Sequence, residues 1–168
     1  MDAQPEDSFN EFYRSSRQRV VTFLLAMTGD RAEAQDTAQE AYVRAWQRWS
    51  AVGGYDDPEA WVRTVAYRLS ISRWRKARNR LVAHRLYGVR EPVAPPDENT
   101  VALVAALKLL PEVDREAVTL HHLLDLSVAD IARQTGTPAN TIKARLVRGR
   151  NRLATLLGRD LSGEITHA

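Results

Sequence analysis

Cysteine is absent from this 168-residue chain, so the sequence excludes disulfide bonds and thiolate metal sites. Long apolar runs are absent as well. The apolar stretch at residues 20–27 is too short to span a bilayer, and it lacks the small-residue cleavage pattern of a signal peptide. These absences predict a soluble, cytoplasmic protein with no membrane insertion.

Signals of catalysis are equally scarce. No strand pattern leads into a glycine-rich phosphate-binding loop, and no nucleophile stands in a recognisable motif. The adjacent His121 and His122 would point about 100° apart on a helix, so they are not expected to share a metal ion. The sequence therefore predicts a protein that is not an enzyme and that has no cofactor and no metal site.

Strand-like alternation is also missing, and almost every periodic stretch is helical. Helices are expected at residues 9–28, 31–49, 58–80, 100–109 and 111–124, followed by two more. Residues 50–57 read as a turn-rich loop, and residues 86–99 lack periodicity and hold three of the seven prolines. The predicted fold class is all-α, with two small helical domains joined by a flexible linker. The expected boundaries are 1–82 for the first domain, 83–99 for the linker, 100–160 for the second domain and 161–168 for a tail.

The net charge of +3 conceals two stretches that have no acidic residue. Residues 60–90 carry nine Lys or Arg and no Asp or Glu, and residues 131–159 carry seven and none. The intervening residues 91–130 are acidic, with eight Asp or Glu against two basic residues. Two basic stretches on two helical modules predict two nucleic-acid-binding surfaces.

Residues 126–157 have the pattern of a helix-turn-helix. Ser127 followed by Asp130 predicts a helix start in which each side chain satisfies a backbone N–H of the other residue. Gly136 predicts the end of that helix, and Thr137 with Pro138 predicts the cap and first turn of a longer one.

The longer helix divides into two faces. Its apolar stripe recurs at steps of three and four residues and consists of Ile142, Leu146, Gly149, Leu153 and Leu156. The opposite face and its flanks offer hydrogen-bonding, small apolar and cationic groups that suit base edges and phosphates. The candidate DNA-binding residues are Thr137, Asn140, Thr141, Lys143, Ala144, Arg145, Val147 and Arg148. The alternative is a solvated helix whose arginines only keep the chain soluble.

The third helix mixes aromatic and basic side chains. They are Trp61, Arg63, Tyr67, Arg68, Arg73, Trp74, Arg75, Lys76 and Arg78. Exposed rings stack on bases and cations follow the phosphate backbone, so the mixture suits single-stranded or partly opened DNA. For each tryptophan taken singly, a core anchor is the favoured alternative. A further polar cluster, Asp36, Gln39, Glu40 and Arg44, marks the outer side of the second helix, where the residues alone favour a solvated face.

Three ordered segments resemble the extracytoplasmic-function (ECF) sigma factors of bacterial RNA polymerase. They are DRAEAQDTAQEAYVRAW at residues 30–46, PEAWVRTVAYRLSISRWRKAR at 58–78 and LSVADIARQTGTPANTIKARLVRGRNRL at 126–153. The first resembles the polymerase-binding helix of region 2, the second the helix that melts and reads the −10 element, and the third the region 4 reader of the −35 element. The tryptophan-rich middle is similar to an actinobacterial subgroup.

The resemblance implies roles and partners for these segments. Core RNA polymerase would bind through its β′ coiled coil to Asp36, Gln39, Glu40, Val43 and Arg44, and would also contact the chain through its β flap. The −10 element would be read and melted by Trp49, Tyr55, Trp61, Arg63, Tyr67, Arg68, Arg73, Arg75 and Lys76, with a flipped base held near Tyr55. The linker at residues 86–99 would occupy the path toward the active-site cleft and RNA exit channel of the polymerase, where its acids Glu91, Asp97 and Glu98 would resemble nucleic acid. Promoter DNA is the other partner, and an anti-sigma factor is a further candidate.

The chain departs from the family pattern at two positions. Arg68 stands where the family often has Asn, and Ser72 where it often has Asp, which bears on the −10 sequence preference.

The predicted function is a dissociable, non-catalytic subunit that directs promoter-specific initiation. Two rival hypotheses are a stand-alone helix-turn-helix regulator, which would leave the first basic stretch unused, and a helical adaptor, which would have no preference for any DNA sequence.

Overall fold

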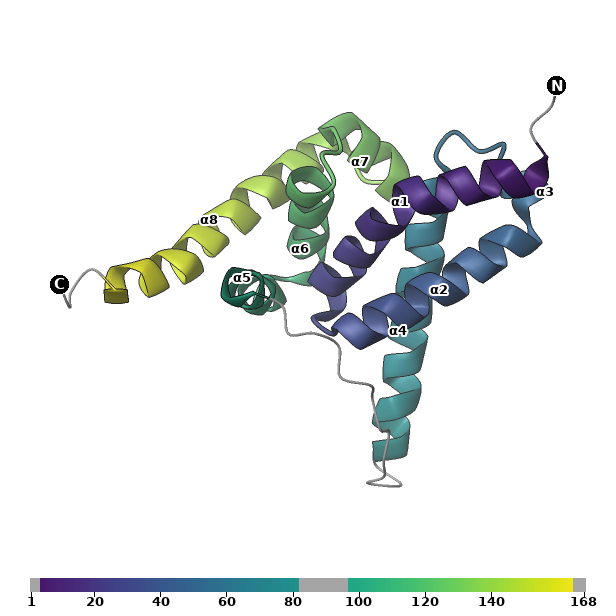
Figure 1. Cartoon of the computed structure of the whole chain (residues 1–168). Coiled ribbons are helices and arrows are strands. Elements are labelled where there is room, and N and C mark those ends of the chain that lie inside the picture. Colours follow the sequence, from purple (N-terminus) through teal and green to yellow (C-terminus); the bar gives the residue numbers. More distant parts are fainter. Residues whose placement is uncertain (1–3, 82–96, 165–168) are drawn as a thin grey trace. The chain divides into compact units, whose positions relative to one another are not determined.

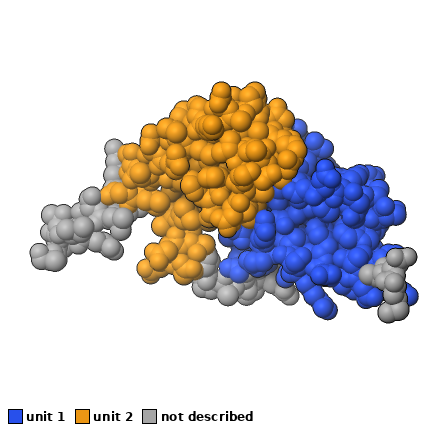
Figure 2. Space-filling model, turned by 90° about the horizontal axis from the view of Figure 1, so that it is seen from above, with its two compact units in different colours: residues 1–94 blue, residues 95–168 orange. Residues whose placement is uncertain are grey.

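The structure, a computed structural model, describes residues 4–81 and 97–164. The chain divides into two compact units, residues 1–94 and 95–168, which Figure 2 shows in different colours. Every regular element in the described residues is helical, so the all-α class is confirmed.

The first unit is built from α1 (Pro5–Thr28), α2 (Arg31–Gln47), α3 (Trp49–Val52) and α4 (Pro58–Leu81) (Figure 1). Gly29 ends α1 in the left-handed conformation, and the Asp30 carboxylate accepts the Glu33 backbone N–H at 3.0 Å to begin α2. These local signals place the helix ends close to where the sequence predicts them. The loop expected at 50–57 is wrong in its first half, because α2 ends at Gln47 and α3 follows.

Alanines let the long helices of this unit approach one another. Ala34, Ala38, Ala41 and Ala45 form the buried stripe of α2, which packs against both α1 and α4. The one large polar residue of that stripe, Tyr42, shares a 2.7 Å hydrogen bond with the Ser16 hydroxyl. Burial raises the pKa of Tyr42 far above its usual value, so the hydroxyl stays neutral inside the unit.

The second unit is built from α5 (Glu98–Lys108), α6 (Glu112–Val118), the π-helical turn η1 (Thr119–Leu123), α7 (Val128–Thr135) and α8 (Ala139–Glu164). Two expectations need correction. The single helix predicted at 111–124 changes from α to π at Thr119, and α5 begins at Glu98, inside the expected linker. Asp97 caps α5 by accepting the Thr100 backbone N–H at 2.9 Å.

The predicted helix-turn-helix is present as α7 and α8, and the structure shows how its helix ends are capped. The Ser127 hydroxyl accepts the Asp130 backbone N–H at 3.1 Å, whereas the Asp130 carboxylate accepts the Ser127 hydroxyl itself, so only half of the predicted reciprocal cap forms. Gly136 has φ = 62°, which favours glycine and ends α7 as predicted. The Thr137 hydroxyl points back to the Thr135 carbonyl instead of capping α8, which begins after Pro138.

The predicted apolar stripe of α8 is its packed face. Ile142 and Leu146 are buried with Ile131 of α7, and Gly149 lies directly against α6. A Cβ at Gly149 would come within 2.4 Å of Val118 Cγ2, so only glycine allows this approach. The packing of this face fixes which side of α8 is turned outward.

Candidate nucleic-acid and polymerase interfaces

The outer face of α8 is exposed as its periodicity predicts. Its exposed members include Asn140, Thr141, Lys143, Ala144, Val147 and Arg148. No Asp or Glu occurs between residues 131 and 159, so this face carries amide, hydroxyl, methyl and cationic groups without a nearby acid from its own helix. Burial raises the pKa of the Glu116 carboxyl on α6, and the charge of Arg145, which is half-buried on α8, partly opposes that rise.

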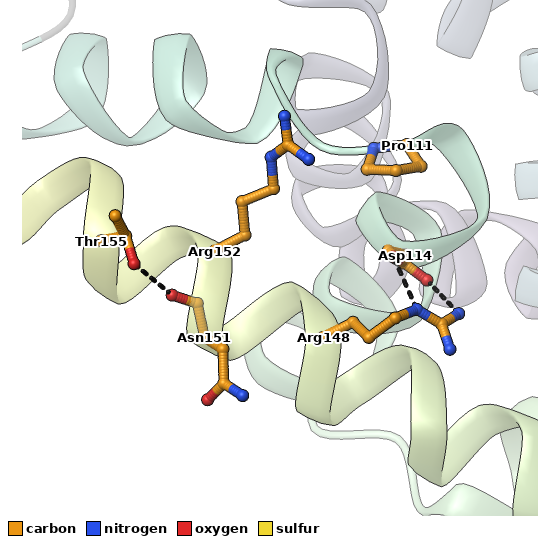
Figure 3. A pocket seen from close by; sticks show the side chains of 6 residues that line it. All are labelled: Pro111, Asp114, Arg148, Asn151, Arg152 and Thr155. Carbon is orange, nitrogen blue, oxygen red and sulfur yellow. Dashed lines mark hydrogen bonds and ion pairs between the residues drawn. The ribbon is translucent and has the colours of Figure 1, made fainter.

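Arg148 differs from its neighbours because it is paired inside the unit. Its Nε and Nη2 atoms donate to the Asp114 carboxylate at 3.2 Å and 2.8 Å, across a pocket of about 470 Å³ (Figure 3). Asp114 is buried on α6, while the Arg148 side chain remains 58% exposed. The sequence gives no sign of this pair, since the two residues are 34 positions apart.

The basic stretch of α4 is less available than its sequence indicates. Arg63 is 3% exposed and donates to Glu59 at 2.6 Å, with Asp57 at 3.9 Å. Burial lowers the pKa of Arg63, and the Glu59 carboxylate opposes that effect. A phosphate would have to displace Glu59 to reach this guanidinium, so the expected DNA contact of Arg63 stays a prediction that its burial does not favour.

Arg73, another candidate phosphate ligand, also has acidic partners. Its Nη2 donates to the Glu40 carboxylate at 2.5 Å, and its Nη1 lies 3.9 Å from Glu33. Glu40 accepts Arg44 at 2.8 Å as well. One predicted polymerase ligand and one predicted DNA ligand thus bind each other, in an ion-pair cluster that joins α2 to α4.

Other cations and rings of α4 remain at the surface. Arg68, Arg75 and Lys76 are exposed, whereas Trp61 and Tyr67 are half-buried, the latter edge-on to Phe23 with ring centroids 6.1 Å apart. Trp74, for which a core anchor was the favoured alternative, is 60% exposed. The Arg78 guanidinium lies over the Trp74 ring, 5.3 Å from its centroid. The sequence carries one signal of this pairing, the four-residue spacing of Trp74 and Arg78 within a stretch that has no acid.

The aromatic residues around α3 have two different environments. Trp49 donates its indole N–H to Ser8 at 2.8 Å and stacks on Phe12 at 5.0 Å, so its ring is part of the packing between α1 and α3. The expectation that Trp49 contacts opened DNA therefore does not fit its position. Tyr55, in contrast, is 48% exposed in the turn before α4.

The predicted polymerase face is the side of α2 that points away from the alanine stripe. Asp36, Gln39 and Arg44 are exposed, and Val43 is 50% exposed among them. An apolar side chain surrounded by charged and amide groups is typical of a protein-binding surface. Glu40 lies on the same helix but is only partly accessible because of its two arginine partners.

The described residues offer neither a metal-binding cluster nor a membrane-spanning helix. Residues 4–81 and 97–164 contain no cluster of three His, Asp or Glu side chains able to hold a metal ion. None of the helices in those ranges is long and apolar enough to cross a membrane.

His121 donates through Nδ1 to the Leu126 carbonyl at 2.7 Å, which ties the π-helical turn to the loop before α7.

Comparison with known proteins shows a match to a known protein family in each of the two units. Residues 12–80 match Sigma-70 region 2, and residues 100–153 match Sigma-70, region 4. The ECF RNA polymerase sigma factor SigL of Mycobacterium tuberculosis is 34% identical over 131 residues, which are 74% of each chain. The sigma factor SigK of Mycobacterium sp. is 26% identical over 90% of this chain and 84% of its own.

A solved structure shares the fold. The sigma factor RpoE of Bartonella quintana, crystallised with the anti-sigma factor NepR, superimposes with a TM-score of 0.72 at 24% identity, over 89% of this chain and 96% of that one. The sequence of SigL and the matches to regions 2 and 4 together identify the family. This chain belongs to the ECF RNA polymerase sigma factors, which direct promoter-specific transcription initiation.

Proposed function

We propose that residues 1–82 bind core polymerase and open the −10 element, and that residues 100–160 recognise the −35 element. The chain itself performs no catalysis and acts in the cytoplasm with the polymerase. The observation that carries this assignment is the division of α8 into a packed apolar face and an exposed, acid-free face. A helix held in that way presents one side to the major groove of a duplex.

For the −35 element, the readers are the exposed residues in the first turns of α8. Asn140 and Thr141 offer hydrogen bonds to base edges, and Ala144 and Val147 offer apolar contacts to thymine methyl groups. Lys143 supplies a cation for a phosphate or a guanine. Thr137 precedes the helix beside them and is half-buried.

For the −10 element, the contacts come from the exposed part of α4 and the turn before it. Arg68, Arg75 and Lys76 follow the phosphates of an opened strand, and Trp74 offers a ring face for stacking. Tyr55 stacks on an extruded base at the start of the helix. Arg63 and Trp49 support this surface from within, through the packing described above.

For core polymerase, the contact surface is Asp36, Gln39 and Val43, with Arg44 at its border. The β′ coiled coil is the proposed partner there, and the β flap is the proposed partner of the second unit. An anti-sigma factor is a further proposed partner, in line with the NepR complex of the Bartonella quintana sigma factor.

Run-off transcription with purified core polymerase tests the whole proposal. The wild-type chain should start RNA synthesis from selected genomic fragments, and core polymerase alone should not. Asp36→Arg should weaken capture of core polymerase, while Arg17→Ala on α1, also an exposed charge, should not. If Asp36→Arg captures core polymerase as well as wild type does, this face of α2 is a solvent-exposed surface and does not bind polymerase.

Promoter opening needs a separate experiment. The free-energy cost of melting must be offset by contacts to the unstacked bases, so residues that make those contacts affect opening in particular. Tyr55→Ala and Arg68→Ala should reduce transcription from duplex promoters far more than from templates already mismatched at −10. Permanganate reactivity of −10 thymines reports the same defect directly. Equal losses on both templates would mean that these residues act in folding or in polymerase binding.

A further inference from the structure

Asp114 is a buried acid in a unit whose proposed ligand is a polyanion. It is 4% exposed on α6, directly behind the DNA-facing helix. A negative charge in this place weakens the attraction between α8 and phosphates. Burying a carboxylate is also costly unless it is paired, so its presence needs a compensating role.

Arg148 is the partner of this carboxylate, and the geometry of the pair leaves the arginine usable. The two hydrogen bonds engage Nε and Nη2, which form one edge of the planar guanidinium (Figure 3). The edge that contains Nη1 makes no hydrogen bond or ion pair within the described residues. More than half of the Arg148 side chain is accessible even though one edge is bound.

We propose that Asp114 is a positioning residue that holds Arg148 in a fixed orientation, so that the free edge of its guanidinium contacts promoter DNA. The inference rests on the proposed function, because it requires the outer face of α8 to lie on the −35 element. An arginine whose rotamer is already fixed loses less conformational entropy on binding than a mobile one. The acid thus increases affinity for DNA through Arg148, although its charge alone would decrease it.

The pair is not required to hold α8 on α6. Close packing already does so, since a Cβ at Gly149 would come within 2.4 Å of Val118 Cγ2 and 3.4 Å of the Asp114 carbonyl oxygen. The feature that the pair determines is therefore the direction of the guanidinium.

The sign of one substitution separates positioning from simple electrostatics. Asp114→Asn removes a negative charge, so electrostatics alone predicts tighter binding to DNA. Positioning predicts the reverse: holoenzyme assembled with Asp114→Asn should bind a −35 duplex about five- to tenfold more weakly, the usual effect of losing one hydrogen bond. The matched control is Glu112→Gln, an exposed acid on the same helix, which should bind as well as wild type or slightly better.

Repeating Asp114→Asn in a chain that lacks Arg148 distinguishes a positioning role of Asp114 from damage to the fold. In an Arg148→Ala chain, Asp114→Asn should cause no further loss, because nothing is left to orient. Arg148→Lys keeps the charge but cannot form the two-donor contact, so it should resemble Asp114→Asn even if the latter folds poorly. Loss of preference at one base pair would identify a base contact, and uniform weakening with a lower salt slope would identify a phosphate contact.

Three outcomes would overturn the inference: Asp114→Asn binding as tightly as wild type, an equal loss caused by Asp114→Asn in the Arg148→Ala chain, or Arg148→Lys binding like wild type. Failure of the proposed function has a different signature. In that case the wild-type holoenzyme itself would show no preference for any −35 sequence, whatever residue stands at position 114.

Discussion

The two basic stretches of this sigma factor look alike in sequence and differ in structure. On α4, Arg63 is buried against Glu59, and Arg73 is bound to Glu40 of α2. On α8, Lys143 has no acidic partner in the described residues, and Arg148 keeps most of its surface exposed. A run of like charge therefore does not measure the charge that a module presents to DNA.

The difference follows from how each helix is packed. Helix α4 contacts both α1 and α2, and α2 brings its acids to the α4 surface. Helix α8 is contacted by α5, α6 and α7, and Arg148 is the cation of its described part that has an acidic hydrogen-bond partner on another helix. Acids thus bind Arg63 and Arg73 on α4, which is packed on two sides, whereas on α8 Arg148 stays more than half exposed although it is paired with Asp114.

The largest expected effect is the loss of the buried ion pair of α4. Arg63→Ala would leave Glu59 buried without its main partner, which typically destabilises a protein by about 3–5 kcal/mol. Urea unfolding of the full chain measures this change. Arg68→Ala, five residues further along and exposed, should change stability by less than about 0.5 kcal/mol and affect only transcription. If the two variants unfold alike, the contrast drawn within α4 is wrong.

The next effect concerns the packed side of α8. Gly149→Ala places a Cβ 2.4 Å from Val118 Cγ2, and such overpacking costs about 1–3 kcal/mol. Gly158→Ala, on the same helix with nothing within 4 Å of the added Cβ, should gain up to about 1 kcal/mol from helix propensity. Thermal unfolding of both variants compares them directly. A lower unfolding temperature for Gly149→Ala and a higher one for Gly158→Ala would support the fixed face of α8, and a neutral Gly149→Ala would contradict it.

Much of the fold could be predicted because its signals are local. Gly29 with Asp30 and Ser127 with Gly136 mark helix ends through their own backbone preferences and side-chain caps. The break between α2 and α3 could not be predicted, because no Gly or Pro marks it. Packing of Trp49 against Ser8 and Phe12, about forty residues earlier, accompanies it. The π-helical turn at Thr119–Leu123 likewise has no local signal.

The candidate sites divide in the same way. Helical periodicity was enough to separate the packed and exposed faces of α8, since one face of a helix follows from its own sequence. The pairing of Arg63 with Glu59 was within reach of the sequence, at a spacing of four residues. The pairs Arg73–Glu40 and Arg148–Asp114 were not, because they depend on which helices lie side by side.

A smaller effect would test the charge that α8 presents. Lys143→Ala should weaken promoter binding by about 1–3 kcal/mol if it loses a base contact, or lower the salt slope by about one if it loses a phosphate contact. Arg73→Ala should change the salt slope less, since that guanidinium is already paired with Glu40. Binding of the holoenzyme to one promoter fragment over a range of salt concentrations gives both slopes. A steeper change for Arg73→Ala would reverse the comparison between the two helices.

The smallest expected effect is electrostatic and lies beside the same helix. Loss of hydration lowers the pKa of His122, and the nearby charges of His121 and Arg150 act in the same direction. Because the folded state disfavours the charged imidazole, the unfolded chain binds this proton first as the pH falls below about 6.5. Stability of the second unit should therefore decrease slightly as the pH falls through the lowered pKa of His122, and His122→Gln should remove that part of the decrease.

Arg150 makes this titration a probe of uncompensated charge on α8. Arg150→Gln should move the pKa of His122 upward, toward its ordinary value, because one repelling cation is gone. The shift is read from the imidazole proton resonance of His122 in an NMR titration. Lys143→Gln, on the same helix but not among the charges that act on His122, is the control. If Arg150→Gln leaves the titration unchanged, the cations of α8 are screened as effectively as those of α4, and the contrast between the two basic stretches is limited to burial.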